Sequence, residues 1–268
     1  MTISRPARIV LRILFLLGLL FIYIPLGVVV INSFNADQTF SWPPQEWTTE
    51  WWQKMVENQG VRDALVSSII VGLIATAIAM VLGTLVALAL GRYSFFGRDT
   101  VSLLIILPIA LPGIVTGIAL NNVFTSYMGG LTFLSILIGH ATFCIVVVYN
   151  NAIARLRRVG TSFDEASMDL GATSWTTFRL VTFPQIRSSL VAGAVLAFGL
   201  SFDEIIVTTF TAPPNIQTLP IWIFNNLFRP NQAPIVNAVA AALVLISILP
   251  VYLAQRLSGN AAHAGGRI

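Results

Sequence analysis

The sequence has few of the residues on which enzymes and metal proteins depend. Its 268 residues include one cysteine, two histidines and 10% charged residues. The single cysteine, Cys144, excludes an intramolecular disulfide and a cysteine-cluster metal site, and no second histidine stands at metal-ligand spacing from His140. A glycine-rich phosphate loop, a His-Glu-x-x-His motif and a serine-hydrolase motif are also missing. We therefore expect a chain that is not an enzyme and that binds neither a metal nor ATP by itself.

The sequence is instead rich in long apolar runs, and 56% of its residues are hydrophobic. About 20 apolar residues are needed to cross the ~30 Å hydrocarbon core of a bilayer. Six runs approach that length, at residues 13–31, 65–90, 101–124, 133–149, 190–210 and 236–253. They predict an all-α, polytopic membrane protein in which residues 1–268 form one domain with six transmembrane helices.

The basic residues predict how these helices are oriented. With both termini in the cytoplasm, twelve of the fifteen basic residues fall on the cytoplasmic side. Only Lys54, Arg62 and Arg229 fall on the other side. This positive-inside asymmetry makes residues 32–63 an extracytoplasmic loop and residues 152–187 a cytoplasmic loop. It also accounts for the basic balance of the chain without a nucleic-acid partner.

The extracytoplasmic loop is rich in tryptophan, with Trp42, Trp47, Trp51 and Trp52. Such residues favour an aromatic belt and an interfacial helix on the outer leaflet. The functional alternative is that this loop is a docking surface for a protein that delivers a solute. The same loop can serve as both an interfacial helix and a docking surface.

The cytoplasmic loop contains the most informative pattern, EASMDLGATSWTTFRLVTFP, from Glu165 to Pro184. Ser162 or Asp164 is expected to cap a short helix, and Gly171 is expected to end it in a left-handed turn. A second helix should run from about Ser174 and end before Pro184. A compact element with an apolar face (Ala166, Leu170, Trp175, Phe178), too short to span a membrane, is expected to dock onto another protein.

This spacing resembles the coupling motif of binding-protein-dependent ABC importer permeases, which reads Glu-Ala-Ala, three residues, Gly, nine residues, Ile, one residue, Leu-Pro. Glu165, Ala166, Gly171 and Pro184 match, while Ser167, Val181 and Phe183 are size-tolerant replacements. The resemblance implies a type I permease fold in a bacterial plasma membrane. It also implies that Glu165, Ala166, Leu170, Gly171 and Pro184 couple the chain to an ATPase.

Two features within the apolar runs bear on a passage for solute. Pro108, Pro112 and Gly113 interrupt the third run, which predicts either a static kink or a gate helix beside the pore. Asp203 and Glu204 lie in the fifth run, where acids are costly and are therefore candidates for function. Either one of them lines a cation-attracting passage, or they are structural acids at a helix break.

Short islands narrow the resemblance to spermidine/putrescine permeases. They are the residues 32–35 (NSFN), His140 with 142–144, 201–204 (SFDE), 219–220 (LP) and 236–238 (VNA). The resemblance implies a polyamine as solute. Beside the acids, we expect the rings of Phe202 and Trp222 to add cation–π contacts and Asn225 to offer a carbonyl oxygen to the pathway. Permeases for ferric iron, thiamine or opines are the alternatives within the same class.

The resemblance also implies an assembly. It comprises a second permease subunit, either a paralogue or a copy of this chain, two ATPase subunits that bind ATP and Mg²⁺, and an extracytoplasmic solute-binding protein. An ion-gradient-driven secondary transporter is the alternative from another class, although the internal repeats and paired broken helices typical of such transporters are not found in the sequence. The sequence leaves open which acid faces the pathway and whether the permease contributes to specificity.

Overall fold

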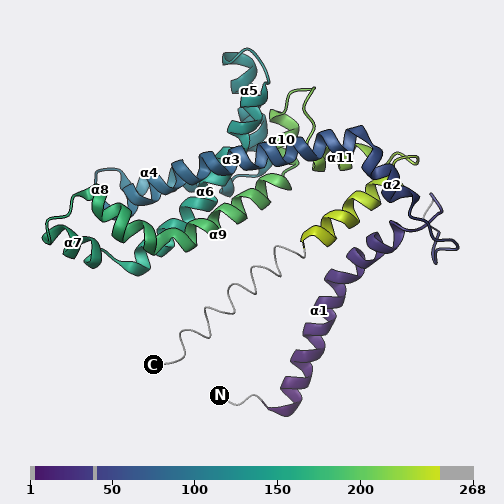
Figure 1. The fold of residues 1–268 in the computed structure, drawn as a ribbon, viewed down its shortest axis with the longest axis horizontal. Coiled ribbons are helices and arrows are strands. Elements are labelled where there is room, and N and C mark those ends of the chain that lie inside the picture. Colours follow the sequence, from purple (N-terminus) through teal and green to yellow (C-terminus); the bar gives the residue numbers. More distant parts are fainter. Residues whose placement is uncertain (1–3, 39–40, 248–268) are drawn as a thin grey trace. The chain divides into compact units, whose positions relative to one another are not determined.

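A computed structural model describes residues 4–38 and 41–247 of the chain, and within these ranges the regular structure is helical apart from one isolated antiparallel bridge. Figure 1 shows the ribbon. The residues divide into two compact units, Met1–Arg62 with Ile223–Ile268 and Asp63–Trp222. The helices are α1 Arg5–Asn32, α2 Glu50–Glu57, α3 Gln59–Arg92, α4 Arg98–Ala110, α5 Gly113–Tyr127, α6 Phe133–Val159, α7 Ser162–Asp169, α8 Ser174–Thr177, the π-helical turn η1 Phe178–Thr182, α9 Phe183–Phe202, α10 Ile206–Thr211 and α11 Leu219–Asn226.

Four helical stretches are long and apolar enough to cross a membrane: Pro6–Asn32, Gln59–Arg92, Phe133–Val159 and Ser174–Phe202. The pair α4 and α5, bent by 104° between Ala110 and Gly113, is a fifth candidate. The described part of the sixth predicted run forms a shorter apolar helix, Ala233–Ser247, and residues 248–253 of that run lie outside the described residues. The prediction of a multi-pass helical membrane protein is thus confirmed in its coarse form, with four or five candidate spans.

The fifth predicted span, at residues 190–210, is wrong in its position. The helix passes through Pro184 and ends at Phe202, before the two acids. It passes through because the π-helical turn η1 precedes the proline. There the N–H of Phe183 bonds the carbonyl of Phe178, five residues back, and this wider turn relieves the clash that a proline ring makes with the preceding turn. The expectation of a helix that ends before Pro184 is corrected by the same observation.

In the first unit, the loop after α1 folds around Asn35, which is fully buried. The Asn35 side chain donates to the Ser41 carbonyl (3.2 Å) and accepts from the Asp37 N–H (3.0 Å). Its backbone carbonyl accepts the indole N–H of Trp51 at 2.9 Å. Trp51 is therefore buried within the loop, whereas Trp42 and Trp47 are exposed. The interfacial helix expected in this loop corresponds to α2, and the NSFN island supplies the centre of its fold.

In the second unit, α6 is the central helix. It packs against α9, α4, α5 and α10, and Figure 1 shows α3, α6 and α9 running side by side. Small residues recur every four positions on α3, from Ala75 to Gly91, and they allow close approach to α6. Ala75, Ala79 and Ala87 are fully buried. A Cβ at Gly83 would lie 2.9 Å from the Ile145 carbonyl oxygen, so only glycine fits there.

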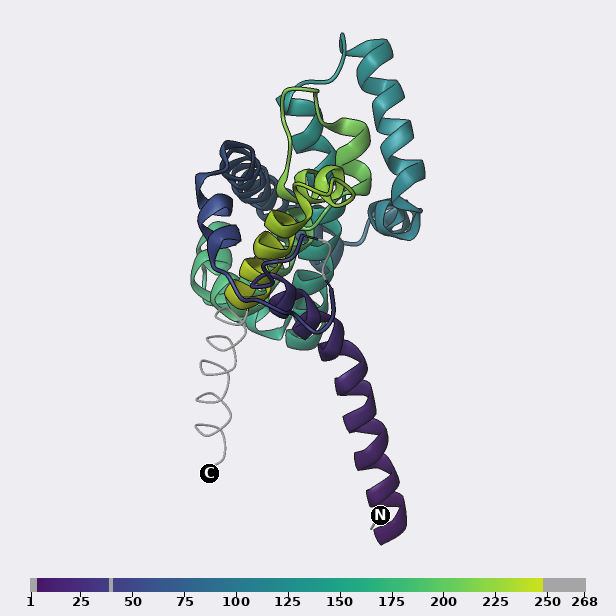
Figure 2. The ribbon, with the colours of Figure 1, turned by 90° about the vertical axis from the view of Figure 1, so that its right-hand side faces the viewer.

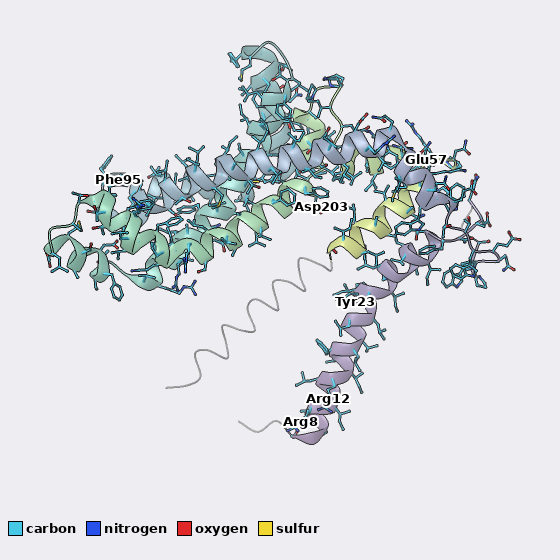
Figure 3. The ribbon with its side chains drawn as sticks, in the orientation of Figure 1. Arg8, Arg12, Tyr23, Glu57, Phe95 and Asp203 are labelled. Atoms are coloured by element: carbon cyan, nitrogen blue, oxygen red, sulfur yellow. The ribbon has the colours of Figure 1, made fainter. Side chains whose placement is uncertain are left out.

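The second unit places α7 and α8 at one end of this helical layer and α10 toward the other. Figure 2, turned by 90°, shows α5 leaving α4 at the bend. Figure 3 labels Asp203 at the end of α9 that is remote from α7 and α8. The two groups of predicted site residues therefore lie at opposite ends of α9.

Candidate functional site

The predicted coupling element is a helix, a tight turn and a second helix, formed by α7, Gly171 and α8. Gly171 has φ +86°. Its N–H bonds the Met168 carbonyl at 2.9 Å, and the Ala172 N–H bonds the Ser167 carbonyl at 3.2 Å. This pair of bonds is a Schellman motif, which requires a left-handed residue at the position of Gly171. The left-handed turn predicted from the sequence is confirmed.

The exposed surface of this element carries large apolar side chains, three of which precede the candidate span Ser174–Phe202. Leu170, immediately before Gly171, is 90% exposed, and Trp175 is 68% exposed. Phe163 and Met168 are also exposed. Glu165 and Ala166 lie on the same exposed surface, and Pro184 is exposed at the start of α9. Burying an exposed leucine of this kind stabilises a complex by about 1.5–3 kcal/mol, so the surface suits a protein partner.

Other residues of the element hold its two helices together. The hydroxyls of Ser167 and Thr177 lie 3.0 Å apart and join α7 to α8. Thr173 caps α8 by accepting the Thr176 N–H at 3.2 Å. Ser167 stands where the family motif has its second alanine. An alanine could not make the bond to Thr177, so this departure from the motif adds a link between α7 and α8.

The predicted cap of α7 is wrong. The residue before α7 is Thr161, which makes no side-chain cap bond, and Ser162 is the first helical residue. Asp164 is buried, and its Oδ2 lies 2.8 Å from Nε of Arg92 at the end of α3. Arg92 was not among the predicted site residues, because the sequence near the motif shows only one half of the pair, the acid directly before Glu165. A cleft of about 420 Å³ lies beside this ion pair, with Glu165 and Phe178 among its lining residues.

At the far end of α9, the two acids lie in a break rather than on one helix. Asp203 ends α9 and is exposed. Glu204 is half-buried, and its Oε1 accepts the N–H of Val207, the second residue of α10, at 2.8 Å. Glu204 therefore satisfies an N–H at the start of α10, as a capping residue does. The structure separates the two acids into one exposed carboxylate and one cap.

The break is held on both sides by His140 of α6, which is fully buried. Its Nδ1 lies 2.7 Å from Oγ of Ser201, before the break, and its Nε2 lies 2.8 Å from Oγ1 of Thr208, after it. Asn121 of α5 donates to the Phe210 carbonyl at 2.6 Å. Polar bonds from α5 and α6 thus fix α10. His140 therefore bonds between helices, whereas Thr142 bonds the Gly139 carbonyl of its own helix.

The remaining predicted pathway residues are spread over several elements. Phe202 is half-buried and packs on Phe198 with ring centroids 5.9 Å apart. On α11, Trp222 is buried and belongs to the second unit, while Asn225 is exposed and belongs to the first. Pro108 lies inside α4, and Pro112 and Gly113 form the bend before α5. A Cβ on Gly113 would lie 3.5 Å from Cγ2 of Ile206, so this bend touches the start of α10.

The two predicted sites are separated by the length of α9. Twenty residues of α-helix span about 30 Å, which is the thickness of the hydrocarbon core of a bilayer. Among the described residues, no three His, Cys, Asp or Glu side chains gather as a group suited to a metal ion. The arrangement consists of an exposed apolar surface at one end of a spanning helix and an exposed carboxylate at the other.

Comparison with known proteins matches residues 79–261 to the model of a family described as "Binding-protein-dependent transport system inner membrane component". The chain is 32% identical over 244 residues to the spermidine/putrescine transport system permease protein PotC of Haemophilus influenzae, covering 91% of this chain and 94% of that protein. It is 31% identical over 266 residues to the putrescine transport system permease protein PotI of Escherichia coli K12, covering 95% and 92%. The fold is similar to a chain from the crystal structure of a bacterial ABC transporter involved in the import of the polysaccharide alginate. That match has a TM-score of 0.71 and 16% identity, and it covers 97% of this chain and 99% of that chain.

Proposed function

This chain belongs to the family of binding-protein-dependent transport system inner membrane components and is a permease subunit of an ABC importer, and we propose that the solute it imports is a polyamine such as putrescine or spermidine. The observation that carries this proposal is the similarity over more than nine-tenths of the chain to permeases named for these two solutes. Because the chain belongs to this family, the alternative of an ion-gradient-driven transporter is excluded.

We assign to Asp203 alone the negative charge that attracts the cationic solute. Its carboxylate is exposed at the end of α9, whereas the carboxylate of Glu204 is occupied by the Val207 N–H. An acid in a passage of low dielectric attracts an ammonium group more strongly than it does in water. The adjacent ring of Phe202 adds a cation–π contact, and Trp222 of α11 is assigned to the same passage. With the coupling element at the cytoplasmic end of α9, Asp203 lies near the outer mouth.

The bend at Pro112 and Gly113 is proposed to gate this passage. Gly113 touches Ile206, which begins α10 directly after the acid-bearing break. A change of angle at the bend therefore displaces the start of α10. Non-helical backbone at membrane depth is tolerated where it is buried in protein or faces a water-filled cavity. Pro108, which lacks a backbone N–H, is a second place at which α4 can bend.

The assembly proposed for the chain contains a second, paralogous permease subunit, two ATPase subunits and an extracytoplasmic solute-binding protein in a bacterial plasma membrane. ATP and Mg²⁺ bind the ATPase subunits. Leu170 and Trp175 enter a groove of the ATPase, and Glu165 meets backbone amides or an arginine there. Closure of the ATPase dimer upon ATP binding displaces α7 and α8. The spanning helices then open outward to receive the solute, and hydrolysis resets them.

Uptake of labelled putrescine by the assembled transporter in proteoliposomes tests the solute. We expect uptake that depends on ATP and on the binding protein, competed by spermidine and not by thiamine or ferric iron. Asp203→Asn should raise the KM for putrescine severalfold, and Glu204→Gln is the matched control that should leave this KM unchanged. Absence of putrescine uptake by the wild-type transporter rejects the solute, and an unchanged KM in Asp203→Asn rejects the role of Asp203.

A further inference from the structure

The buried ion pair between Arg92 and Asp164 joins the last residue of α3 to α7. Nε of Arg92 lies 2.8 Å from Oδ2 of Asp164, and the two side chains are only 13% and 11% exposed. Most ion pairs at protein surfaces are exposed and contribute little. In a shielded pair, by contrast, loss of one partner leaves the other charge buried and uncompensated, so this contact is expected to stay closed when α7 moves.

Both members of the pair hold further segments. Nη1 of Arg92 donates to the carbonyl of Gly160, the residue that ends α6. Oδ1 of Asp164 accepts the hydroxyl proton of Thr182 at 2.9 Å. Thr182 ends η1, which continues directly into α9. The pair thereby connects α7 to the ends of three spanning helices, α3, α6 and α9.

The helix α7 has two different sides. Asp164 is buried against Arg92 of α3, whereas Glu165, Ala166 and, directly after the helix, Leu170 are exposed. A helix of eight residues moves as a rigid body, but it transmits motion only through the contacts that fix it. The chain enters α7 from α6 through Gly160, which has φ +73°, and leaves α7 through Gly171, which has φ +86°, so both chain connections are turns.

We propose that the Arg92–Asp164 pair is the joint through which displacement of α7 reaches α3. Arg92 and Asp164 are positioning residues that touch neither the solute nor the ATPase. Without the pair, the ATPase still binds the exposed side of α7, but its closure no longer moves α3. This inference rests on the proposed role of α7 and α8 as the coupling element and adds the route by which their motion enters the membrane helices.

The test uses the complete transporter with Asp164→Asn, Arg92→Gln, and the exchange Arg92→Asp with Asp164→Arg. Three quantities are measured: ATPase subunits retained on purification, putrescine uptake, and the rise in ATP hydrolysis caused by solute-loaded binding protein. Each single variant should retain the ATPase, lose at least tenfold in uptake and lose the rise in hydrolysis. The exchange should recover uptake severalfold, although incompletely, because an aspartate at position 92 faces the Gly160 carbonyl.

Two matched controls make the same chemical changes at exposed sites nearby. Asp169→Asn lies on α7, and Arg157→Gln lies near the end of α6, and both should transport normally. Normal coupling in Asp164→Asn, while Gly171→Val is defective, overturns the joint and leaves the coupling element in place. Loss of the ATPase from the single variants also overturns it, because the pair would then only shape the docking surface. If Gly171→Val couples normally as well, the proposed coupling element itself falls.

Discussion

The Nε2 atom of His140 lies 2.8 Å from Oγ1 of Thr208, and Nδ1 of the same ring lies 2.7 Å from Oγ of Ser201. One buried side chain of α6 therefore bonds the helix before the break at Asp203 and the helix after it. The Thr208 hydroxyl in turn donates to the Glu204 carbonyl at 2.8 Å. The position of Asp203 thus depends on a polar network made of His140, Ser201, Thr208 and Glu204, all of them outside the proposed pathway.

Replacing His140 with phenylalanine should destabilise the protein, because it leaves the buried Ser201 hydroxyl without its bond to the ring, whereas Thr208 keeps its bond to the Glu204 carbonyl. A buried hydroxyl left unpaired costs about 1–3 kcal/mol. Thermal unfolding in detergent should show a Tm lower by several degrees. Thr142→Val on the same helix is the control and should change the Tm little, since that hydroxyl bonds only the Gly139 carbonyl of its own helix. Equal Tm values for His140→Phe and the wild type would refute the role of this network.

Gly171→Val should reduce uptake strongly while leaving membrane insertion intact. A β-branched residue is strained at φ +86°, and the Schellman bonds that close α7 would be disturbed. Gly171→Asn is the control, because asparagine tolerates left-handed backbone, and it should retain most of the uptake. The measurement is putrescine uptake normalised to the amount of chain in the membrane, and wild-type uptake by Gly171→Val would contradict the assignment.

Leu170→Asp should detach the ATPase subunits. Leu170 is 90% exposed, so the substitution does not disturb the permease core, but it places a charge where an apolar groove of the partner is expected. We expect at least a tenfold loss of ATPase upon co-purification, with unchanged thermal stability of the permease. Leu170→Met keeps the volume and apolar character and should retain the ATPase. Full retention by Leu170→Asp would show that the partner binds elsewhere.

Glu204 should behave as a structural residue. Glu204→Ala removes the acceptor of the Val207 N–H and should cost about 1 kcal/mol, as the loss of a helix cap does. Glu204→Gln keeps a carbonyl oxygen in the same place and should be nearly neutral. Unfolding in detergent measures both. A large effect of Glu204→Gln on the KM for putrescine, without an effect on stability, would assign Glu204 to the pathway.

Cysteine labelling tests the orientation in a Cys144→Ser background. Trp47→Cys should react with a membrane-impermeant reagent from outside intact cells, and Ser162→Cys should react only after the cells are opened. Both side chains at these positions are exposed, so a lack of reaction reports the side of the membrane and not burial. The reverse pattern would overturn the predicted topology, and with it the cytoplasmic position of the coupling element.

Features that depend on local spacing were predictable from the sequence. The apolar runs predicted the helical membrane protein, because the length needed to cross a bilayer is fixed. The small residues Ala75, Ala79, Gly83, Ala87 and Gly91 recur every four residues, a spacing typical of a helix face that packs closely in a membrane, and they form the face of α3 against α6. The left-handed turn at Gly171 followed from the residue type, because glycine adopts positive φ at low cost.

Only the tertiary structure decided which distant side chains meet and which acid is free. Arg92 and Asp164 are brought together by the packing of α3 against α7, and nothing in the spacing between them specifies that contact. The helix through Pro184 depends on the π-helical turn before it, which hydropathy does not reveal. Asp203 and Glu204 are neighbours of the same charge, and they differ because α10 begins directly after them and its unpaired N–H groups take one carboxylate. The sequence determined which stretches of the chain are helical and apolar. Packing among α3, α6, α9 and α10 determined which side chains meet, because contacts between residues far apart in the chain form only when the helices are assembled.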